Sequence, residues 1–176
     1  MKPLSRAALL GASSAVALVG LPLVAGFVEA AERADAGDIA TLNAAISLEL
    51  AAIKAYQDAL GTGLLTPGVA AIASRFTSDH GAHRDALSAA VTAGGYTPSQ
   101  ATAWLTYPPL NTQADILRFA MAVERKAAAT YLSVVPDLKD RRLAGFAAAI
   151  LGVETTHVST LASALGVPVY ESGFVS

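Results

Sequence analysis

Four amphipathic segments, each with an apolar stripe interrupted by acidic residues or histidines near its middle, constrain this chain more than any other feature. Apolar residues recur at intervals of three and four over residues 38–60, 66–94, 112–135 and 137–165. This spacing places them on one face of a helix. The interrupting residues are Glu49 in the first stripe, His80 and His83 in the second, Glu124 in the third, and Glu154 and His157 in the fourth. Four packed helices would bring these six side chains to one level of a shared core.

The pattern occurs twice along the chain. Glu49 and Tyr56 are followed 75 residues later by Glu124 and Tyr131, and the pair His80 and His83 is followed 74 residues later by Glu154 and His157. A helical hairpin too short to bury its own apolar face can bury it against a second copy. The repeat therefore predicts an all-α four-helix bundle made of two duplicated helical hairpins.

Local signals delimit the helices. Helix-capping and helix-ending residues occur at each boundary: Asp38 as the first N-cap, Thr66 and Pro67 at the second start, Gly94 and Gly95 at the second end, the Thr112-x-x-Asp115 capping box, Pro136 after the third helix, and Gly166 and Pro168 after the fourth. The fourth helix is expected to run from about Asp137 to Leu165.

The connections predict how the helices pair. Helices 1 and 2, and helices 3 and 4, are joined by a few residues, which makes antiparallel pairs. Residues 94–111 form a long link that contains Pro98, Pro108 and Pro109 and can cross the full bundle between helices 2 and 3. The aromatic residues Tyr96, Trp104 and Tyr107 are expected to pack this crossover against the helices.

Composition agrees with this fold and excludes several functions. The chain is 53% hydrophobic and 15% charged, with a formal charge of -2 and no cluster of Lys or Arg. Nucleic acid is therefore not an expected partner, because phosphate binding requires concentrated positive charge. The absence of cysteine excludes disulfides, thiolate metal sites and iron–sulfur clusters.

The N-terminus is typical of an exported protein. Lys2 and Arg6 precede an uncharged stretch from Ala7 to Val28, and Val28-Glu29-Ala30 has the spacing that a signal peptidase recognises. We predict an export signal or N-terminal anchor at residues 1–30, a linker at 31–37, the bundle at 38–166 and a C-terminal tail at 167–176. The protein would be periplasmic or otherwise exported, and membrane-attached only if the N-terminal segment is retained. A buried N-terminal helix of the domain is the alternative.

The six interrupting residues are suited to binding metal. A carboxylate inside an apolar bundle is costly unless it is paired or metal-bound, and three carboxylates beside three imidazoles can compensate two divalent cations. Carboxylate di-metal bundles use one Glu from each of two helices and a Glu-x-x-His pair from each of the other two. Glu49, Glu124, Glu154 and His157 fit this arrangement, whereas His80 stands where a glutamate is expected. The ligands then carry three negative charges rather than four, which leaves both a one-metal and a two-metal site open.

Other interpretations of the same residues remain open at this point. In a metal-free polar core, Glu49 or Glu124 would pair with one of the arginines Arg75, Arg84, Arg118 and Arg125. Tyr56 and Tyr131 are interpreted as ordinary core tyrosines rather than as partners of metal ligands. Asp79 is either a solvated surface residue or an outer partner that orients a ligand histidine.

Several segments resemble a known family. Leu48-Glu49-Leu50-Ala51-Ala52-Ile53-Lys54-Ala55-Tyr56, Asp79-His80-Gly81-Ala82-His83 and Val123-Glu124-Arg125-Lys126-Ala127-Ala128-Ala129-Thr130-Tyr131 resemble the ferritin-like superfamily, and most closely its exported bacterial domains. The resemblance covers nearly all of residues 38–166. It implies that Glu49, His83, Glu124, Glu154 and His157 are metal ligands, with His80 as a substituted one. It also implies that iron, as a di-iron pair, is the first choice of metal, ahead of manganese or zinc.

Two hypotheses of different classes follow. The first is an exported ferritin-like metal-binding protein that oxidises metal or reacts with dioxygen or peroxide, as a di-iron oxidoreductase or ferroxidase-like enzyme would. The second is a metal-free structural or interaction bundle of the cell envelope, related to stress or desiccation. Iron storage would require a large homo-oligomer, and the apolar tail at residues 167–176 offers either packing on the bundle or a contact between two copies.

Overall fold

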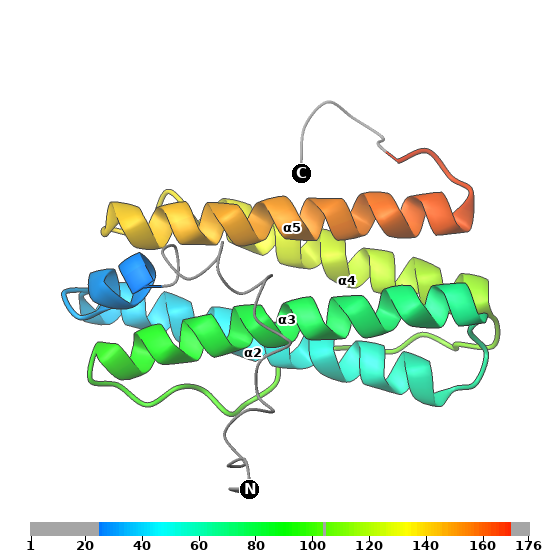
Figure 1. Cartoon of the computed structure of the whole chain (residues 1–176), viewed down its shortest axis with the longest axis horizontal. Helices are drawn as coiled ribbons and strands as arrows, with labels where there is room; N and C mark the ends of the chain where they lie inside the picture. Colours follow the sequence, from blue (N-terminus) through cyan, green and yellow to red (C-terminus); the bar gives the residue numbers. More distant parts are fainter. Residues whose placement is uncertain (1–24, 104, 170–176) are drawn as a thin grey trace, which may run out of the picture.

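The computed structural model describes residues 25–103 and 105–169, and their main feature is an antiparallel bundle of four long helices (Figure 1). The helices are α2 (Ala36–Gly61), α3 (Pro67–Ala93), α4 (Gln113–Val134) and α5 (Arg141–Leu165). A shorter helix at residues 25–31 precedes α2, and the described residues contain no strand. The predicted all-α four-helix fold is confirmed.

The bundle consists of two hairpins. Helix α2 packs mainly on α3 and α4 mainly on α5, while contacts between α2 and α4 and between α3 and α5 join the hairpins. Short links connect the partners within each hairpin, as predicted. Among the described helices, α2 alone is long and apolar enough to cross a bilayer. Its buried face lies in the bundle core, which accounts for that composition.

The crossover between α3 and α4 lies along α2, as Figure 1 shows. The side chain of Asn43 on α2 makes two hydrogen bonds with the crossover. It donates to the carbonyl oxygen of Thr97 at 3.3 Å and accepts from the backbone N–H of Ser99 at 2.7 Å. Further along, the hydroxyl of Tyr107 donates to Asp58 at 2.9 Å. Tyr107 therefore holds the crossover to the bundle as expected, whereas Tyr96 is exposed and Trp104 lies outside the described residues.

Helix α3 begins after Thr66 with Pro67 in its first turn, and α4 begins with the predicted capping box of Thr112 and Asp115. The predicted starts of the other two helices are wrong. Asp35, not Asp38, caps α2, and Asp140, not Asp137, caps α5.

Asp38 does not cap α2 because its side chain makes a tertiary contact. Its carboxylate is buried and accepts the backbone N–H groups of Lys139 and Asp140, each at 3.0 Å. Asp38 therefore binds the link before α5 instead of capping its own helix. The N–H groups of Gly37 and Asp38 are satisfied by Asp35, at 2.8 and 2.9 Å.

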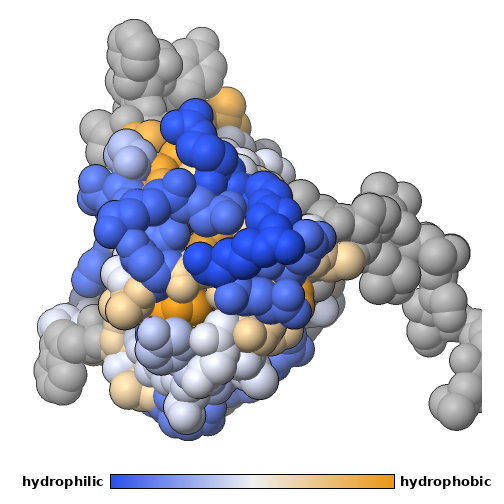
Figure 2. Space-filling view, turned by 90° about the vertical axis from the view of Figure 1, so that its left-hand side faces the viewer, coloured by the Kyte–Doolittle hydropathy of each residue, from blue (hydrophilic) through white to orange (hydrophobic). Residues whose placement is uncertain are grey.

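The helix at residues 25–31 covers one end of the bundle. The ring of Phe27 stacks on that of Phe146 with centroids 3.8 Å apart, and Phe27, Ala30 and Ala31 are at most 2% exposed. Hydrophilic residues gather over this end of the molecule (Figure 2). Glu29, on the same short helix as Phe27, pairs with both Arg33 and Arg142. The described part of the predicted export signal is thus packed on the domain, while residues 1–24 lie outside the described residues.

The buried core is divided into two apolar clusters. One surrounds Leu42, Leu87 and Leu143, and the other surrounds Phe76 and Leu161. A layer of buried polar residues lies between these clusters. Burying polar and charged side chains at the centre of the fold costs free energy unless they are paired or bound to an ion. Such a layer therefore points to a function.

Candidate metal centre

The structure brings together all six side chains predicted from the stripes. Helix α3 contributes two histidines, α2 and α4 contribute one glutamate each, and α5 contributes a glutamate and a histidine: His80, His83, Glu49, Glu124, Glu154 and His157. Five of them are at most 2% exposed. The side chain of His83 is 13% exposed, so this six-residue layer approaches solvent on the His83 side.

The layer contains two clusters of ligand-type atoms. In the first cluster, Nδ1 of His80 lies 2.7 Å from Oε2 of Glu49 and 3.8 Å from Oε1 of Glu154. Nδ1 of His83 completes it, at 3.6 Å from the same Glu49 oxygen and 3.2 Å from the same Glu154 oxygen. These four atoms come from three helices and lie close enough together to hold one cation.

The second cluster lies on the other side of His80 and Glu154. Nε2 of His80 is 3.2 Å from Oε1 of Glu124, whose Oε2 is 3.2 Å from Nδ1 of His157. That His157 nitrogen is also 3.5 Å from Oε2 of Glu154. His80 and Glu154 therefore belong to both clusters, whereas Glu49 and His83 belong to the first and Glu124 and His157 to the second.

Glu154 is the most informative residue of the layer. It is completely buried, yet neither of its carboxylate oxygens has a hydrogen-bond partner. Nδ1 of His83 and Nε2 of His157 are also buried without one. An unsatisfied buried polar atom costs about 1–3 kcal/mol, and more when the group is charged. Divalent cations in the two clusters would supply partners for both Glu154 oxygens and for Nδ1 of His83, so the residues present fit a metal pair.

Electrostatics makes the layer zwitterionic when no metal is bound. Burial opposes charge on every group, but the hydrogen bond from His80 and the nearby imidazole of His83 hold the pKa of Glu49 at about 2. Hydrogen bonds to Glu124 and Glu49 conversely raise the pKa of His80 to about 11 against the effect of burial. Against the effect of burial, the nearby glutamates likewise raise the pKa of His83 and that of His157 to about 9.

The two remaining carboxylates differ in the same environment. Despite burial, hydrogen bonds from His157 and His80 lower the pKa of Glu124 below the ordinary range of a glutamate. Burial raises the pKa of Glu154, which has no hydrogen bond that satisfies its oxygens. Glu154 is therefore the carboxylate that gains most from an added positive charge.

Two tyrosines bind the layer from opposite sides. The hydroxyl of Tyr56 on α2 donates to Oε1 of Glu124 on α4, and the hydroxyl of Tyr131 on α4 donates to Oε1 of Glu49 on α2. The interpretation of these residues as ordinary core tyrosines was wrong, because each orients a carboxylate of the layer. The shared seven-residue spacing from each glutamate was the sequence signal that could have identified this role.

Asp79 has the outer role that the sequence left open. Its Oδ2 lies 3.5 Å from Nε2 of His157, and its carboxylate accepts two hydrogen bonds of 2.9 Å from Nε of Arg75. The ring of Phe76, which is on α3 like Asp79, stacks on the ring of His157, with centroids 3.7 Å apart. These contacts direct Nδ1 of His157 towards the glutamates.

Three of the four arginines considered as glutamate partners are bound elsewhere. Arg75 pairs with Asp79, Arg84 with Asp85, and Arg118 with Asp115. The contacts of Glu49 and Glu124 described above are instead with histidines and tyrosines. An arginine-neutralised core built on these three residues is therefore excluded.

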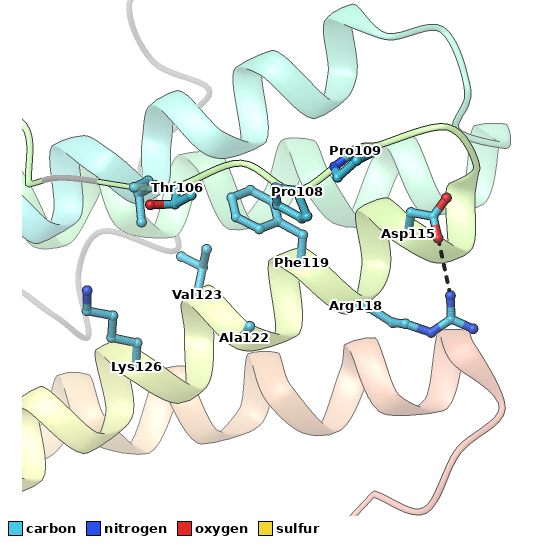
Figure 3. Close-up of a pocket in the computed structure, with 10 residues that line it drawn as sticks. Thr106, Pro108, Pro109, Asp115, Arg118, Phe119, Ala122, Val123 and Lys126 are labelled. Atoms are coloured by element: carbon cyan, nitrogen blue, oxygen red, sulfur yellow. Dashed lines mark hydrogen bonds and ion pairs between the residues drawn. The ribbon is translucent and has the colours of Figure 1, made fainter.

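An open pocket of about 600 Å³ lies elsewhere on the molecule, between the crossover and α4 (Figure 3). Pro108, Phe119 and Val123 give it an apolar lining, and Arg118 and Lys126 lie at its edges. None of its lining residues belongs to the six-residue layer. The pocket is therefore not an entrance that these residues themselves form.

Comparisons with known proteins agree with the geometry. The model of a family described as a ferritin-like domain matches residues 37–167. Among curated proteins, none matches this chain. Solved structures share the fold as well, including the following three.

The first is a ferritin-like, diiron-carboxylate protein from Bacillus anthracis, 19% identical, with a TM-score of 0.64 over 73% of this chain and 95% of that one. A conserved hypothetical protein from Mycobacterium tuberculosis is 26% identical, with a TM-score of 0.63 over 78% and 96% of the two chains. Rhodobacter capsulatus bacterioferritin, described with a metal-free dinuclear site and heme iron, is 23% identical, with a TM-score of 0.60 over 75% and 85%. With the family match spanning most of its length, the chain belongs to the ferritin-like domain family.

Proposed function

We propose that this protein binds two transition-metal ions, iron foremost, in the six-residue layer and uses them in reactions with dioxygen or peroxide. The observation that carries the proposal is Glu154, whose two buried oxygens lack hydrogen bonds and face different clusters. A bridging carboxylate has this position. The histidines and glutamates on either side supply mixed nitrogen and oxygen ligands, which suit iron and also accept manganese or zinc.

The relatives support iron as the first choice. The Bacillus anthracis protein is described as a diiron-carboxylate protein, and the Rhodobacter capsulatus bacterioferritin as having a dinuclear site that is metal-free in that structure. A bound iron pair would supply redox chemistry towards dioxygen or peroxide. The protein residues would bind and orient the ions: Tyr56 and Tyr131 hold the glutamates, and Asp79 holds His157.

We further propose that the protein acts outside the cytoplasm. The charged start at Lys2 and Arg6 and the uncharged stretch that follows support export. The packing of Phe27 and Ala30 on the bundle supports the version in which the N-terminal segment is retained over cleavage after Ala30. In that version the segment would attach the domain to a membrane.

Anaerobic titration of the full chain with ferrous iron tests the metal proposal. The wild-type chain and an exposed-site control, Glu32→Gln, are expected to bind two ions per chain and to consume dioxygen when air is admitted. Glu154→Gln is expected to lose the second ion and the dioxygen consumption, because an amide cannot bridge two cations as a carboxylate does. Equal behaviour of Glu154→Gln and wild type would refute the proposed site.

A metal-free structural bundle is the second candidate. It is favoured by the mutual pairing of histidines and glutamates, which leaves Glu49 and His80 hydrogen-bonded without any metal. Under this alternative the chain would bind no iron in the titration, and Glu154→Gln would fold with equal or greater stability because a buried acid without hydrogen bonds is removed.

A further inference from the structure

We propose that His80 bridges the two metal ions as an imidazolate, with Nδ1 bound to the ion of the first cluster and Nε2 to the ion of the second. The proposal rests on the metal-binding function above and specifies how the site differs from an all-carboxylate bridge. Glu154 would bridge the same two ions through its two oxygens. The site would then have one carboxylate bridge and one imidazolate bridge.

The direction of the His80 ring carries this inference. Its Nδ1 lies among the Glu49 and Glu154 oxygens of the first cluster, and its Nε2 lies 3.2 Å from Glu124 in the second. The two nitrogens of an imidazole point away from each other, so one ring can serve two ions only from between them. His80 is the histidine of the layer that both clusters share.

The ring is fixed in this orientation. His80 is completely buried and lies stacked near Tyr56, with ring centroids 5.7 Å apart. The neighbouring histidines are oriented differently, because each of them faces one cluster through Nδ1. For His157 the opposite nitrogen faces Asp79, 3.5 Å away, and this contact excludes it from a bridging role.

Charge gives an independent reason for the bridge. Glu49, Glu124 and Glu154 together carry three negative charges, one fewer than two divalent cations need for neutrality inside an apolar core. An imidazolate supplies the fourth. The substitution of His80 for the glutamate expected from the sequence pattern is thus compensated without any further residue.

The proton and electron balance is simple. On binding, each ring nitrogen of His80 forms a bond to one ion through its lone pair, and the ring protons of the metal-free state leave to solvent. No electron is transferred and no co-reactant is consumed. A one-metal site would differ, because His80 would bind a single ion and keep one N–H, which would donate to the carboxylate of the other cluster.

Nuclear magnetic resonance of the full chain, labelled with ¹⁵N-histidine and loaded with ¹¹³Cd²⁺, distinguishes these cases. A nitrogen bound to ¹¹³Cd shows a one-bond splitting, and the three histidines provide six ring nitrogens. The bridge predicts two cadmium ions per chain and splitting at four ring nitrogens, both nitrogens of His80 included. The variant His80→Glu, which assigns the His80 signals, is expected to bind two ions and show splitting at two nitrogens.

The other possible outcomes separate a failure of the His80 bridge from a failure of metal binding. Two cadmium ions with splitting at only three nitrogens, or a persistent N–H on His80, would overturn the bridge and leave the metal-binding function standing. One cadmium ion per chain would also overturn the bridge. A chain that binds no cadmium would contradict the metal-binding function itself. The count of split nitrogens in the wild-type chain decides the matter even if His80→Glu does not fold.

Discussion

At the scale of single residues, the six-residue layer depends on contacts that cross the bundle. Glu49 on α2 is held by Tyr131 on α4, and Glu124 on α4 is held by Tyr56 on α2. Each tyrosine body packs in an apolar cluster while its hydroxyl reaches the layer. The carboxylates are therefore oriented before any metal arrives, which reduces the entropic cost of binding.

Removal of one hydroxyl tests this role. Tyr131→Phe leaves the packing of the ring but removes a hydrogen bond to an ionised carboxylate, so we expect a loss of about 1.5–3 kcal/mol in the free energy of unfolding. Metal affinity is expected to fall about 10–100-fold, as is usual when an outer partner of a ligand is lost. Tyr96→Phe, at an exposed tyrosine, is the control. Urea unfolding and competition with a chelator measure the two effects, and unchanged affinity in Tyr131→Phe would contradict the orienting role.

The histidines make the stability of the metal-free chain depend on pH. Glutamate contacts raise the pKa of His83 and that of His157 to about 9, above the value of about 6.5 for an unfolded histidine. Their contribution to stability is therefore complete below about pH 6.5 and is lost as the pH rises through about 9. We expect the free energy of unfolding with chelator present to fall between pH 6.5 and pH 9.5.

Metal should reverse this trend, because ligand histidines must release their protons to bind it. The stabilisation produced by saturating Zn²⁺ is expected to increase over the same pH range. Urea unfolding at several pH values, with chelator and with Zn²⁺, measures both slopes. A metal-free stability that is flat or rises from pH 6.5 to pH 9.5 would show that the imidazole–carboxylate pairs do not form.

The positions of the six layer residues were predictable because each is a polar side chain in an otherwise apolar stripe. The hydrogen bonds of the two tyrosine hydroxyls were not predictable, since Tyr56 and Tyr131 fit an apolar stripe equally well with or without a carboxylate partner. The sequence also could not predict that His80 and Glu154 belong to both clusters. It depends on how far each helix is rotated about its axis, which spacing along one helix does not determine.

At the scale of helices, close packing at the end of α3 positions the bundle against the N-terminal helix. A Cβ atom at Gly94 would lie 2.8 Å from Cδ1 of Ile39 and 3.0 Å from the carbonyl oxygen of Ala31. The backbone φ of Gly94 is -70°, which any residue adopts. Glycine is therefore required at this position for space and not for backbone freedom.

A pair of glycine substitutions tests this contact. Gly94→Ala is expected to destabilise the chain by about 1–3 kcal/mol, because an added methyl group overpacks a filled site. Gly145→Ala, in an open part of α5, is expected to stabilise it by up to about 1 kcal/mol through helix propensity. Thermal or urea unfolding gives both values. Equal effects of the two substitutions would show that α3 does not approach Ile39 and Ala31 so closely.

Helix ends were predictable where residues next to the end determine it, and not where a contact with a distant part of the chain does. Pro67 and the capping box of Thr112 and Asp115 act within a few residues of their own helices, so the sequence was sufficient. Asp38 has the residue type of an N-cap, but its carboxylate binds a backbone segment about 100 residues away. No signal within the α2 segment indicates that partner.

At the scale of the whole molecule, a polar layer lies between two apolar clusters, and a short N-terminal helix covers the end of one of them. The charge and apolarity of residues 1–30 predict export, but they do not show whether the end of that segment packs on the domain. The contact depends on the shape of the surface formed by α5, where the ring of Phe146 stacks on that of Phe27.

The contribution of this helix can be measured in the full chain. Phe27→Ala is expected to lower the free energy of unfolding by about 3–5 kcal/mol, as is typical for a buried phenylalanine. Leu64→Ala, at a residue 41% exposed, is the control and should change it by less than about 0.5 kcal/mol. If Phe27→Ala were as stable as the control, the N-terminal helix would not be an integral part of the domain.

Metal analysis of the full chain, purified without chelators, is the sharpest test of whether the six-residue layer is a metal site. We expect two transition-metal ions per chain, iron among them, with Glu32→Gln unchanged and Glu154→Gln depleted. A wild-type chain that contains no metal, and takes up none when iron, manganese or zinc is supplied, would contradict the account. The buried layer would then be a set of imidazole–carboxylate pairs in a structural bundle.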